Sequence, residues 1–245
     1  MSINISIRRV FIALLFLFGT TNGFTQSPKT LDLGEFNTIS LNSDYKVTIR
    51  QSNTQEVIAT ADPEIWSATN IWVDNGTLHI DVKGNEGSKK NLLKKIEDKI
   101  TGTMELSITM KNLRKIIVNG NGSVTAENSI SSGILDVEMN GDGRVNVDVK
   151  ATRVKASIFS QGEIQITGYA DQLNLTAAGN GIFNGTNFDV KKVDANVRGS
   201  ATDCTLSVSE ALNIDLYGGS QVFYKGAAKQ INRKIYGSGS VLFRN

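Results

Sequence analysis

Apolar and polar side chains alternate in short segments between residues 116 and 240, and the same pattern returns at a nearly constant interval. Each segment ends at a small turn, and the turns start at residues 120, 141, 160, 179, 199, 218 and 237, which are 19 to 21 residues apart. Counted back from each turn, positions minus two, minus four and minus six are aliphatic in almost every repeat. Because neighbouring side chains of a strand point to opposite faces, these three positions share one face. The pattern predicts a half-buried strand before every turn.

Two all-β architectures could use a period near twenty. In a parallel β-helix each repeat forms one coil, and equivalent positions stack into continuous interior columns. In a meander or barrel each repeat forms one hairpin. The constant register of the three columns favours the parallel β-helix, because a coil of fixed circumference tolerates small length changes only. Glycine at the turns permits positive φ and close backbone approach. The predicted structural turn residues are Gly120, Gly141, Gly162, Gly179, Gly199, Gly218 and Gly237.

From the second repeat on, the aliphatic columns contain one polar residue, Arg233, in the last repeat. An open end of the β-helix would allow this side chain to reach water. Second strands follow the turns, and Cys204 lies on the apolar phase of one of them. We therefore expect Cys204, the single cysteine, to be a buried and inert thiol, and no intramolecular disulfide can form.

Residues 35–118 are also strand-like but less regular. Asn75-Gly76 is typical of a tight hairpin turn, and residues 63–69 could form a short helical turn. His79 falls on the polar phase of its strand, so we expect it to be solvated and without a metal. Residues 88–100 are lysine-rich with leucine and isoleucine at helical spacing, and helix and loop both remain open. This segment could cover one end of a β core or lie on an anionic membrane surface.

The N-terminus has the layout of a secretory signal peptide over residues 1–25, in which Arg8 and Arg9 precede the apolar run 10–18. A retained membrane anchor is the alternative, but the apolar run is shorter than a bilayer span requires. Residues 26–34 are expected to be a flexible leader, followed by one β-helical domain over 35–245. Removal of residues 1–25 reduces the formal charge from +2 to 0. This balance argues against a nucleic-acid partner, since phosphate binding requires a clustered basic face.

Several features together resemble one family of exported bacterial proteins. They are the strand-like run 45–49, the hairpin 75–80, Leu113 ahead of 116–118, the repeated Gly turns, and the closing segment 236–241. In these features the sequence resembles the head GIN domain family, whose members are common in Bacteroidetes and are described as autotransporter adhesins. The resemblance spans about 36–243 and implies a single-stranded right-handed parallel β-helix of about seven Gly-turn repeats. Ser160, Ala201, Ser220 and the segment 182–188 depart from the family pattern and leave the local turn shape open.

The outward positions of the repeats carry the candidate functional residues. Asn, Ser, Thr and Asp alternate with the buried columns, and aromatic residues lie immediately before several turns. Such a surface could bind a glycan or an envelope or surface protein. The candidate binding residues are Asn174, Asn196, Asn213, Tyr217 and Tyr236. Alternatively, the polar residues only solvate the outer wall, and Tyr217 and Tyr236 stack on each other across adjacent coils.

No catalytic set can be assembled from the sequence, so we expect a non-enzymatic protein without a cofactor or metal. The outward acids Asp136, Glu138, Asp194 and Asp215 are isolated in sequence rather than paired at a defined separation. Calcium-binding repeats need a recurrent carboxylate, which the turns lack. We expect a binding or adhesion module exported to the periplasm, the cell surface or the medium. A periplasmic scaffold and a carbohydrate-active enzyme are the alternatives.

Overall fold

The computed structural model describes residues 28–83, 103–199 and 202–244. The predicted signal peptide and the segment 88–100 lie outside the described residues. One short helix, α1 (Pro63–Ala68), accompanies the strands in the described part of the chain. The strands are β1 (Lys29–Leu31), β2 (Thr38–Asn42), β3 (Lys46–Gln51), β4 (Glu56–Thr60), β5 (Thr69–Asp74), β6 (Thr77–Val82), β7 (Glu105–Met110), β8 (Lys115–Val118), β9 (Ser123–Ala126), β10 (Ile130–Met139), β11 (Arg144–Ile158), β12 (Glu163–Ala178), β13 (Ile182–Gly199), β14 (Asp203–Gly218), β15 (Gln221–Lys225), β16 (Gln230–Tyr236) and β17 (Ser240–Phe243).

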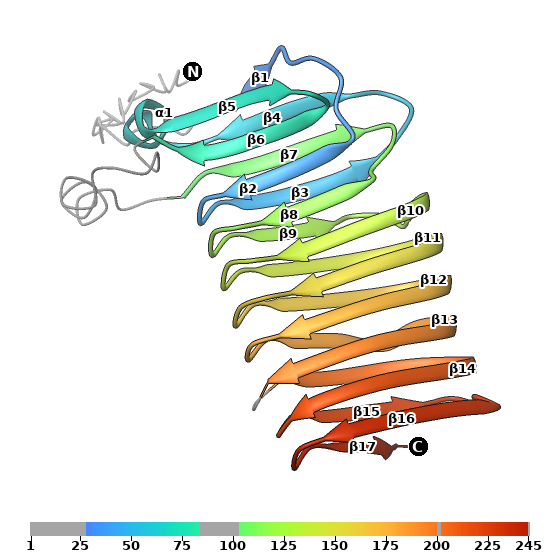
Figure 1. Ribbon diagram of the computed structural model, residues 1–245. Coiled ribbons are helices and arrows are strands. Elements are labelled where there is room, and N and C mark those ends of the chain that lie inside the picture. Colours follow the sequence, from blue (N-terminus) through green and yellow to red (C-terminus); the bar gives the residue numbers. More distant parts are fainter. Residues whose placement is uncertain (1–27, 84–102, 200–201, 245) are drawn as a thin grey trace, which may run out of the picture.

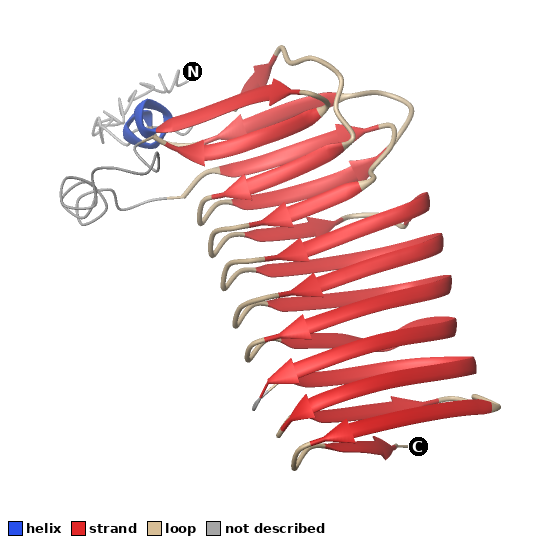
Figure 2. Ribbon diagram, in the orientation of Figure 1, coloured by secondary structure: helices blue, strands red, loops and turns tan. Residues whose placement is uncertain are grey.

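The predicted parallel β-helix is confirmed, and each coil is flattened into two arms (Figures 1 and 2). The arm after a Gly turn is called the first arm, and the arm before the next turn is called the second arm. Strands β11 to β14 are long enough to include both arms, and they pair in parallel with their neighbours over nearly their whole length. In Figure 1 the front arms run to the left and the rear arms to the right as the chain descends, so the coil is right-handed.

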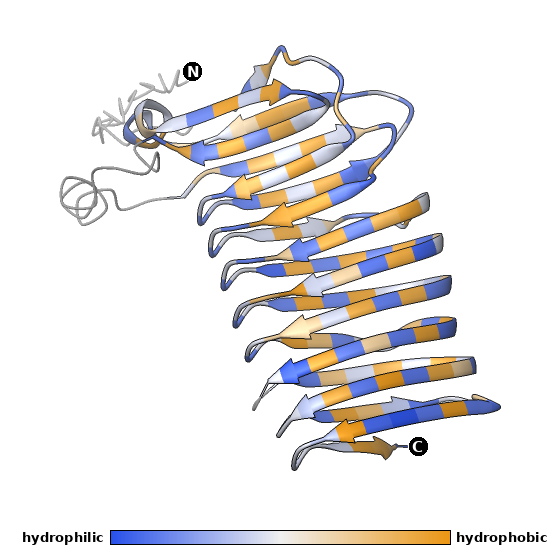
Figure 3. Ribbon diagram, viewed as in Figure 1, coloured by the Kyte–Doolittle hydropathy of each residue, from blue (hydrophilic) through white to orange (hydrophobic). Residues whose placement is uncertain are grey.

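The predicted aliphatic columns form the core between the two arms. Leu135 pairs with Val154, Val154 with Leu173, Leu173 with Val193 and Val193 with Leu212. All five side chains are at most 1% exposed. The alternation of hydrophobic and hydrophilic colour along each arm in Figure 3 is the same period-two pattern. Burial of these stacked ladders stabilises the fold by roughly 25 cal/mol for each Å² of apolar surface removed from water.

The repeat that aligned poorly in the sequence is a local irregularity of the first arm. The register shifts between Gln165 and Gly168 where β12 meets β13, and again between Gly185 and Asp189 where β13 meets β14. The first arm of β13 is longer than its neighbours at this point, and its two phenylalanines, Phe183 and Phe188, are both almost completely buried. The insertion therefore bulges the strand and leaves the coil intact.

The N-terminal part follows a different order in space from its order in sequence. The coil formed by β2 and β3 lies between the coil of β6 and β7 and the coil of β8 and β9. Beyond it, β4 pairs antiparallel with β7, and β1 pairs antiparallel with β4. The predicted hairpin at Asn75-Gly76 joins β5 and β6, and both turn residues have positive φ. The predicted helical turn is α1.

Two predictions for this region need correction. The leader 26–34 is not flexible throughout, because Lys29–Leu31 form β1 against β4. His79 is half-buried rather than fully solvated, since its ring stacks on Trp72 with centroids 4.8 Å apart. Period-two counting assigned His79 to the outward face correctly, but it could not show that a cross-strand partner covers that face.

Among the described strands, none lies beyond the last coil at the C-terminal end of the β-helix. Strand β16 pairs with β14, and β17 pairs with β15. All seven residues of β16 are exposed. Arg233 is accessible as predicted, whereas Ile231 and Ile235 of the aliphatic columns are 37% and 43% exposed. The columns are therefore exposed in the last described coil, which Figure 1 shows at the C-terminal end of the β-helix.

Candidate functional site

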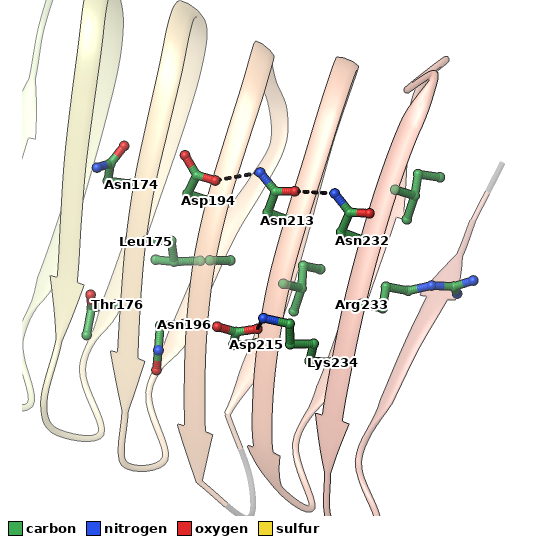
Figure 4. Close-up of a pocket in the computed structure, with 13 residues that line it drawn as sticks. Asn174, Leu175, Thr176, Asp194, Asn196, Asn213, Asp215, Asn232, Arg233 and Lys234 are labelled. Atoms are coloured by element: carbon green, nitrogen blue, oxygen red, sulfur yellow. Dashed lines mark hydrogen bonds and ion pairs between the residues drawn. The ribbon is translucent and has the colours of Figure 1, made fainter.

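The outward side chains of the last four second arms form a groove between two polar rows (Figure 4). The first row, called the asparagine row, consists of Asn174, Asp194, Asn213 and Asn232. The second row, called the mixed row, consists of Thr176, Asn196, Asp215 and Lys234. The groove is open and has a volume of about 880 Å³. Because equivalent residues of adjacent strands are about 4.8 Å apart, the rows offer polar groups at a fixed repeat along the β-helix.

The asparagine row is a hydrogen-bonded chain. Asn213 Nδ2 donates to Asp194 Oδ1 at 2.7 Å, and Asn232 Nδ2 donates to Asn213 Oδ1 at 2.9 Å. Asn213 and Asn232 therefore each use one donor within the row and keep further hydrogen-bonding capacity for a ligand, since an asparagine amide has two donors and two lone pairs. The predicted residue Asn174 lies at the N-terminal end of this row (Figure 4).

The mixed row is held by charged side chains. Arg198 Nε donates to Asn196 Oδ1 at 2.8 Å, and Lys234 Nζ lies 3.9 Å from Asp215 Oδ1. Arg198 and Lys234 were not among the predicted site residues. Their positions, one and three residues before a turn, are outward in the predicted register, so the same counting could have included them.

The predicted stack of Tyr217 and Tyr236 is confirmed. The ring centroids are 4.8 Å apart and the ring planes differ by 12°. The guanidinium of Arg198 lies 5.1 Å from the Tyr217 ring, which is within cation–π range. Because the centroid separation equals the strand spacing, the ring faces point along the β-helix axis. The stack therefore presents ring edges and hydroxyl groups outward, and one face of Tyr236 is directed toward the open C-terminal end.

The outward carboxylates are neutralised or hydrogen-bonded where they lie. Lys115 Nζ contacts Glu138 at 2.9 Å and Asp136 at 3.8 Å, and Lys155 lies 3.8 Å from Asp136. The hydrogen bond from Asn140 and the contact with Lys115 lower the pKa of Glu138, and the hydrogen bond to Glu138 raises the pKa of Lys115. Both carboxylates thus belong to an ion-pair network with Lys115.

Other reactive groups are similarly occupied or covered. Cys204 is buried as predicted, and burial raises the pKa of its thiol to about 12, which disfavours the reactive thiolate. Among the described residues, no group of three or more His, Cys, Asp or Glu side chains converges on a metal position. In the same part of the chain, no helix has the length and apolar character needed to cross a membrane.

The predicted turn glycines are required by the stacking. A Cβ on Gly141 would lie 2.1 Å from the carbonyl oxygen of Gly120 in the adjacent coil. Gly218 adds a second requirement, because its φ is +99°. An eighth corner, at Ser43 and Asp44, stacks on Gly120 without a glycine of its own. The repeat could not reveal this corner because it is outside the twenty-residue spacing.

The chain is similar to one known protein family over most of its length. The family model described as "Putative auto-transporter adhesin, head GIN domain" matches residues 35–228. The chain belongs to this family. The resemblance inferred from the Gly turns and the N-terminal strands is thereby confirmed, and the family description is that of an adhesin rather than an enzyme. It also implies that head GIN proteins are exported. No match was found among curated proteins.

Solved structures share the fold of this head GIN protein. A structure titled as a putative adhesin from Bacteroides fragilis is 21% identical, with a TM-score of 0.79, and the match covers 91% of this chain and 98% of that one. A putative adhesin from Parabacteroides distasonis is 19% identical, with a TM-score of 0.67 and coverage of 90% and 97%. A putative lipid binding protein from the same species is 19% identical, with a TM-score of 0.62 and coverage of 91% and 98%.

Proposed function

We propose that this head GIN protein is an exported, non-enzymatic binding module that holds a glycan in the groove between the asparagine row and the mixed row. The observation that carries the proposal is the groove itself, in which amide, hydroxyl and carboxylate groups recur at the strand spacing along four coils. A carbohydrate chain presents hydroxyl groups at repeated intervals, and neutral amides can both donate to and accept from them.

The stacked tyrosines define how a sugar would approach. Tyr217 and Tyr236 are 37% and 54% exposed, but their faces are directed along the axis. A sugar lying over the groove would contact their edges and hydroxyl groups. A sugar at the C-terminal end could pack on the open face of Tyr236. The groove therefore predicts recognition that depends more on the asparagines than on aromatic stacking.

A periplasmic scaffold without a ligand of its own is the second candidate, and a specific observation favours it. Outward asparagines also bind one another away from the groove. Asn42 Nδ2 donates to Asp81, Asn119 Nδ2 donates to Asn42, and Asn140 Nδ2 donates to Asn119 Oδ1 at 2.8 Å. A polar row on this β-helix can thus stabilise the stacking of adjacent coils through side-chain hydrogen bonds.

A glycan array probed with the purified mature protein separates the two candidates. The double substitution Asn196→Ala and Asn213→Ala should reduce binding of any glycan hit at least tenfold, while Asn146→Ala on the opposite outer face should leave binding unchanged. Tyr236→Ala should have a smaller effect than the double substitution. Absence of binding across the array would favour the scaffold.

Location needs its own measurement. Protease treatment of intact cells should degrade the protein if it acts as a surface adhesin. Complete protection in intact cells, with degradation after the outer membrane is opened, would place the protein in the periplasm and contradict the adhesin role.

A further inference from the structure

The free strand edge of β16 at the C-terminal end is a second candidate interaction surface, and it adjoins the groove, whose lining includes Ile231 and Arg233. One side of β16 pairs with β14, and no pairing with another described strand occupies its other side. An unpaired edge presents alternate N–H and C=O groups that can template another strand. At the N-terminal end, β4 and β1 add antiparallel strands beyond β7, and α1 contributes the buried side chain of Ile65. Unpaired strand edges also occur at the N-terminal end, where β5 pairs only with β6 among the described strands.

The open edge also exposes apolar surface that every interior coil buries. Ile231 and Ile235 pair with Leu212 and Leu216, which are completely buried. No described strand lies beyond them, and the two isoleucines are 37% and 43% exposed, while Phe243 on β17 is 55% exposed. One additional strand alongside β16 would cover the isoleucine positions in the same way that each coil covers the preceding one. Exposed apolar patches of this kind mark interaction sites.

The charge at this end restricts the chemistry of the partner. No acidic residue follows Asp215 in the sequence, whereas five basic residues do: Lys225, Lys229, Arg233, Lys234 and Arg244. Arg233 lies on the inward column between Ile231 and Ile235, and its Nη1 donates to the carbonyl oxygen of Val241 at 3.3 Å. An inward charge on an edge strand opposes pairing with an identical edge, because two such arginines would repel each other.

We infer that β16 is a docking edge for an extended acidic segment of a partner protein, which adds a strand to the second-arm sheet. Main-chain hydrogen bonds to the free edge supply the pairing, and alternate side chains supply the selection, as in other cases of strand addition. The matching segment has an acidic residue at the position facing Arg233 and apolar residues two positions before and after it. These three side chains continue the columns of Ile231, Arg233 and Ile235.

A charge-swap experiment with a defined peptide tests this inference. The probe is a fluorescein-labelled peptide with the sequence Ser-Thr-Val-Thr-Glu-Thr-Val-Thr-Ser, and binding to the mature protein is followed by fluorescence anisotropy. A second peptide carries Lys in place of Glu, and a third carries Pro in place of the two central Thr residues. We expect saturable binding of the acidic peptide, at least tenfold weaker binding of the Lys peptide, and no binding of the Pro peptide, which cannot pair along the strand.

Substitutions in the protein should reverse this preference. Arg233→Glu should favour the Lys peptide, and the control Arg153→Glu, on an interior coil, should leave the preference for the acidic peptide unchanged. Circular dichroism and thermal melting establish that both variants fold. The acidic peptide should also slow amide hydrogen exchange in 230–236 of the wild-type protein, as strand pairing requires.

Three results would overturn the inference. The first is no saturable binding of the acidic peptide up to about 1 mM, which corresponds to a standard binding free energy of only about −4 kcal/mol. The second is equal binding of the Glu and Lys peptides, because the charge argument would then fail. The third is Arg233-dependent binding to phosphatidylglycerol vesicles without any peptide binding, which would make an anionic membrane surface the partner. The groove proposal is tested separately, by glycan binding in the Asn196→Ala and Asn213→Ala double variant, in which β16 is unchanged.

Discussion

The N-terminal coils and the C-terminal repeats form the same two-armed coil. They differ in whether the coils stack in the order in which they follow one another in the sequence. In the repeats, stacked residues are about one period apart, as Leu173 and Val193 are. In the N-terminal part, Lys46 pairs with Ser123 and Thr38 pairs with Thr77. The coil of β2 and β3 is thus inserted between two coils that follow it in the chain. A coil can therefore be added out of order when its two strands match the register of the neighbours.

This difference has a consequence for folding. Contacts between successive repeats are short in sequence, so each coil can be added to the previous one with a modest loss of chain entropy. The inserted coil closes much longer loops, because the Asn119 side chain reaches Asn42, 77 residues earlier. We expect the N-terminal coils to be the slower part of the molecule to assemble.

The largest effect should follow from a substitution at a stacked corner. Gly141→Val places a Cβ about where the Gly120 carbonyl oxygen lies, so the two coils must move apart. We expect a loss of unfolding free energy of about 3–5 kcal/mol, measured by urea unfolding. Gly133→Val is the matched control, because no atom lies within 4 Å of a Cβ at that position. Similar losses for both variants would show that the corner contact does not limit stability.

An intermediate effect should follow in the N-terminal coils. The Tyr45 hydroxyl lies 2.6 Å from Thr69 Oγ1, which itself donates to the Ile65 carbonyl, so Tyr45 donates to Thr69. Tyr45→Phe removes this buried bond and should cost about 1–2 kcal/mol in thermal or urea unfolding. Burial raises the pKa of Tyr45 above its ordinary value of 10.0.

The Tyr45 pKa also sets the sign of a pH effect. The unfolded protein loses the tyrosine proton at a lower pH than the folded protein, so stability should fall as the pH rises above about 10. This component should disappear in Tyr45→Phe. Tyr236→Phe, at an exposed ring, should retain it. An unchanged alkaline profile in Tyr45→Phe would contradict the assignment.

The smallest effect should come from the ion-pair network between the two regions. Glu138→Gln removes the contact with Lys115 and should cost no more than about 1 kcal/mol near neutral pH, since both side chains are partly solvated. The pKa of Glu138 is lowered from 4.5, so its contribution is present above that pH and is lost as the pH falls through the lower folded-state pKa. The free energy of unfolding is measured as a function of acid pH for this variant and for Glu105→Gln. The Glu105 partner Lys46 is more exposed than Lys115, so loss of that ion pair should have no measurable effect on stability.

Much of the candidate site was accessible from the sequence because of the repeat. The register placed Asn174, Asn196 and Asn213 on the outer face, and the structure places all three along one groove. It also predicted the stack of Tyr217 and Tyr236. The register could not show which outward side chains bind one another. The hydrogen bond from Arg198 to Asn196 and the hydrogen bonds that link Asp194, Asn213 and Asn232 are therefore known only from the structure.

The sequence by itself determined the parallel β-helix of the repeats, since three aliphatic columns and a glycine corner recur at a period that fits one coil. The tertiary structure alone decided the order of the N-terminal coils, because strands such as β2 carry the same alternating pattern whichever neighbour they pair with. It also decided that Ile231 and Ile235 remain exposed. Periodicity specifies which face of a strand is apolar, but burial of that face depends on whether another coil follows, and here the last coil has no described neighbour beyond it.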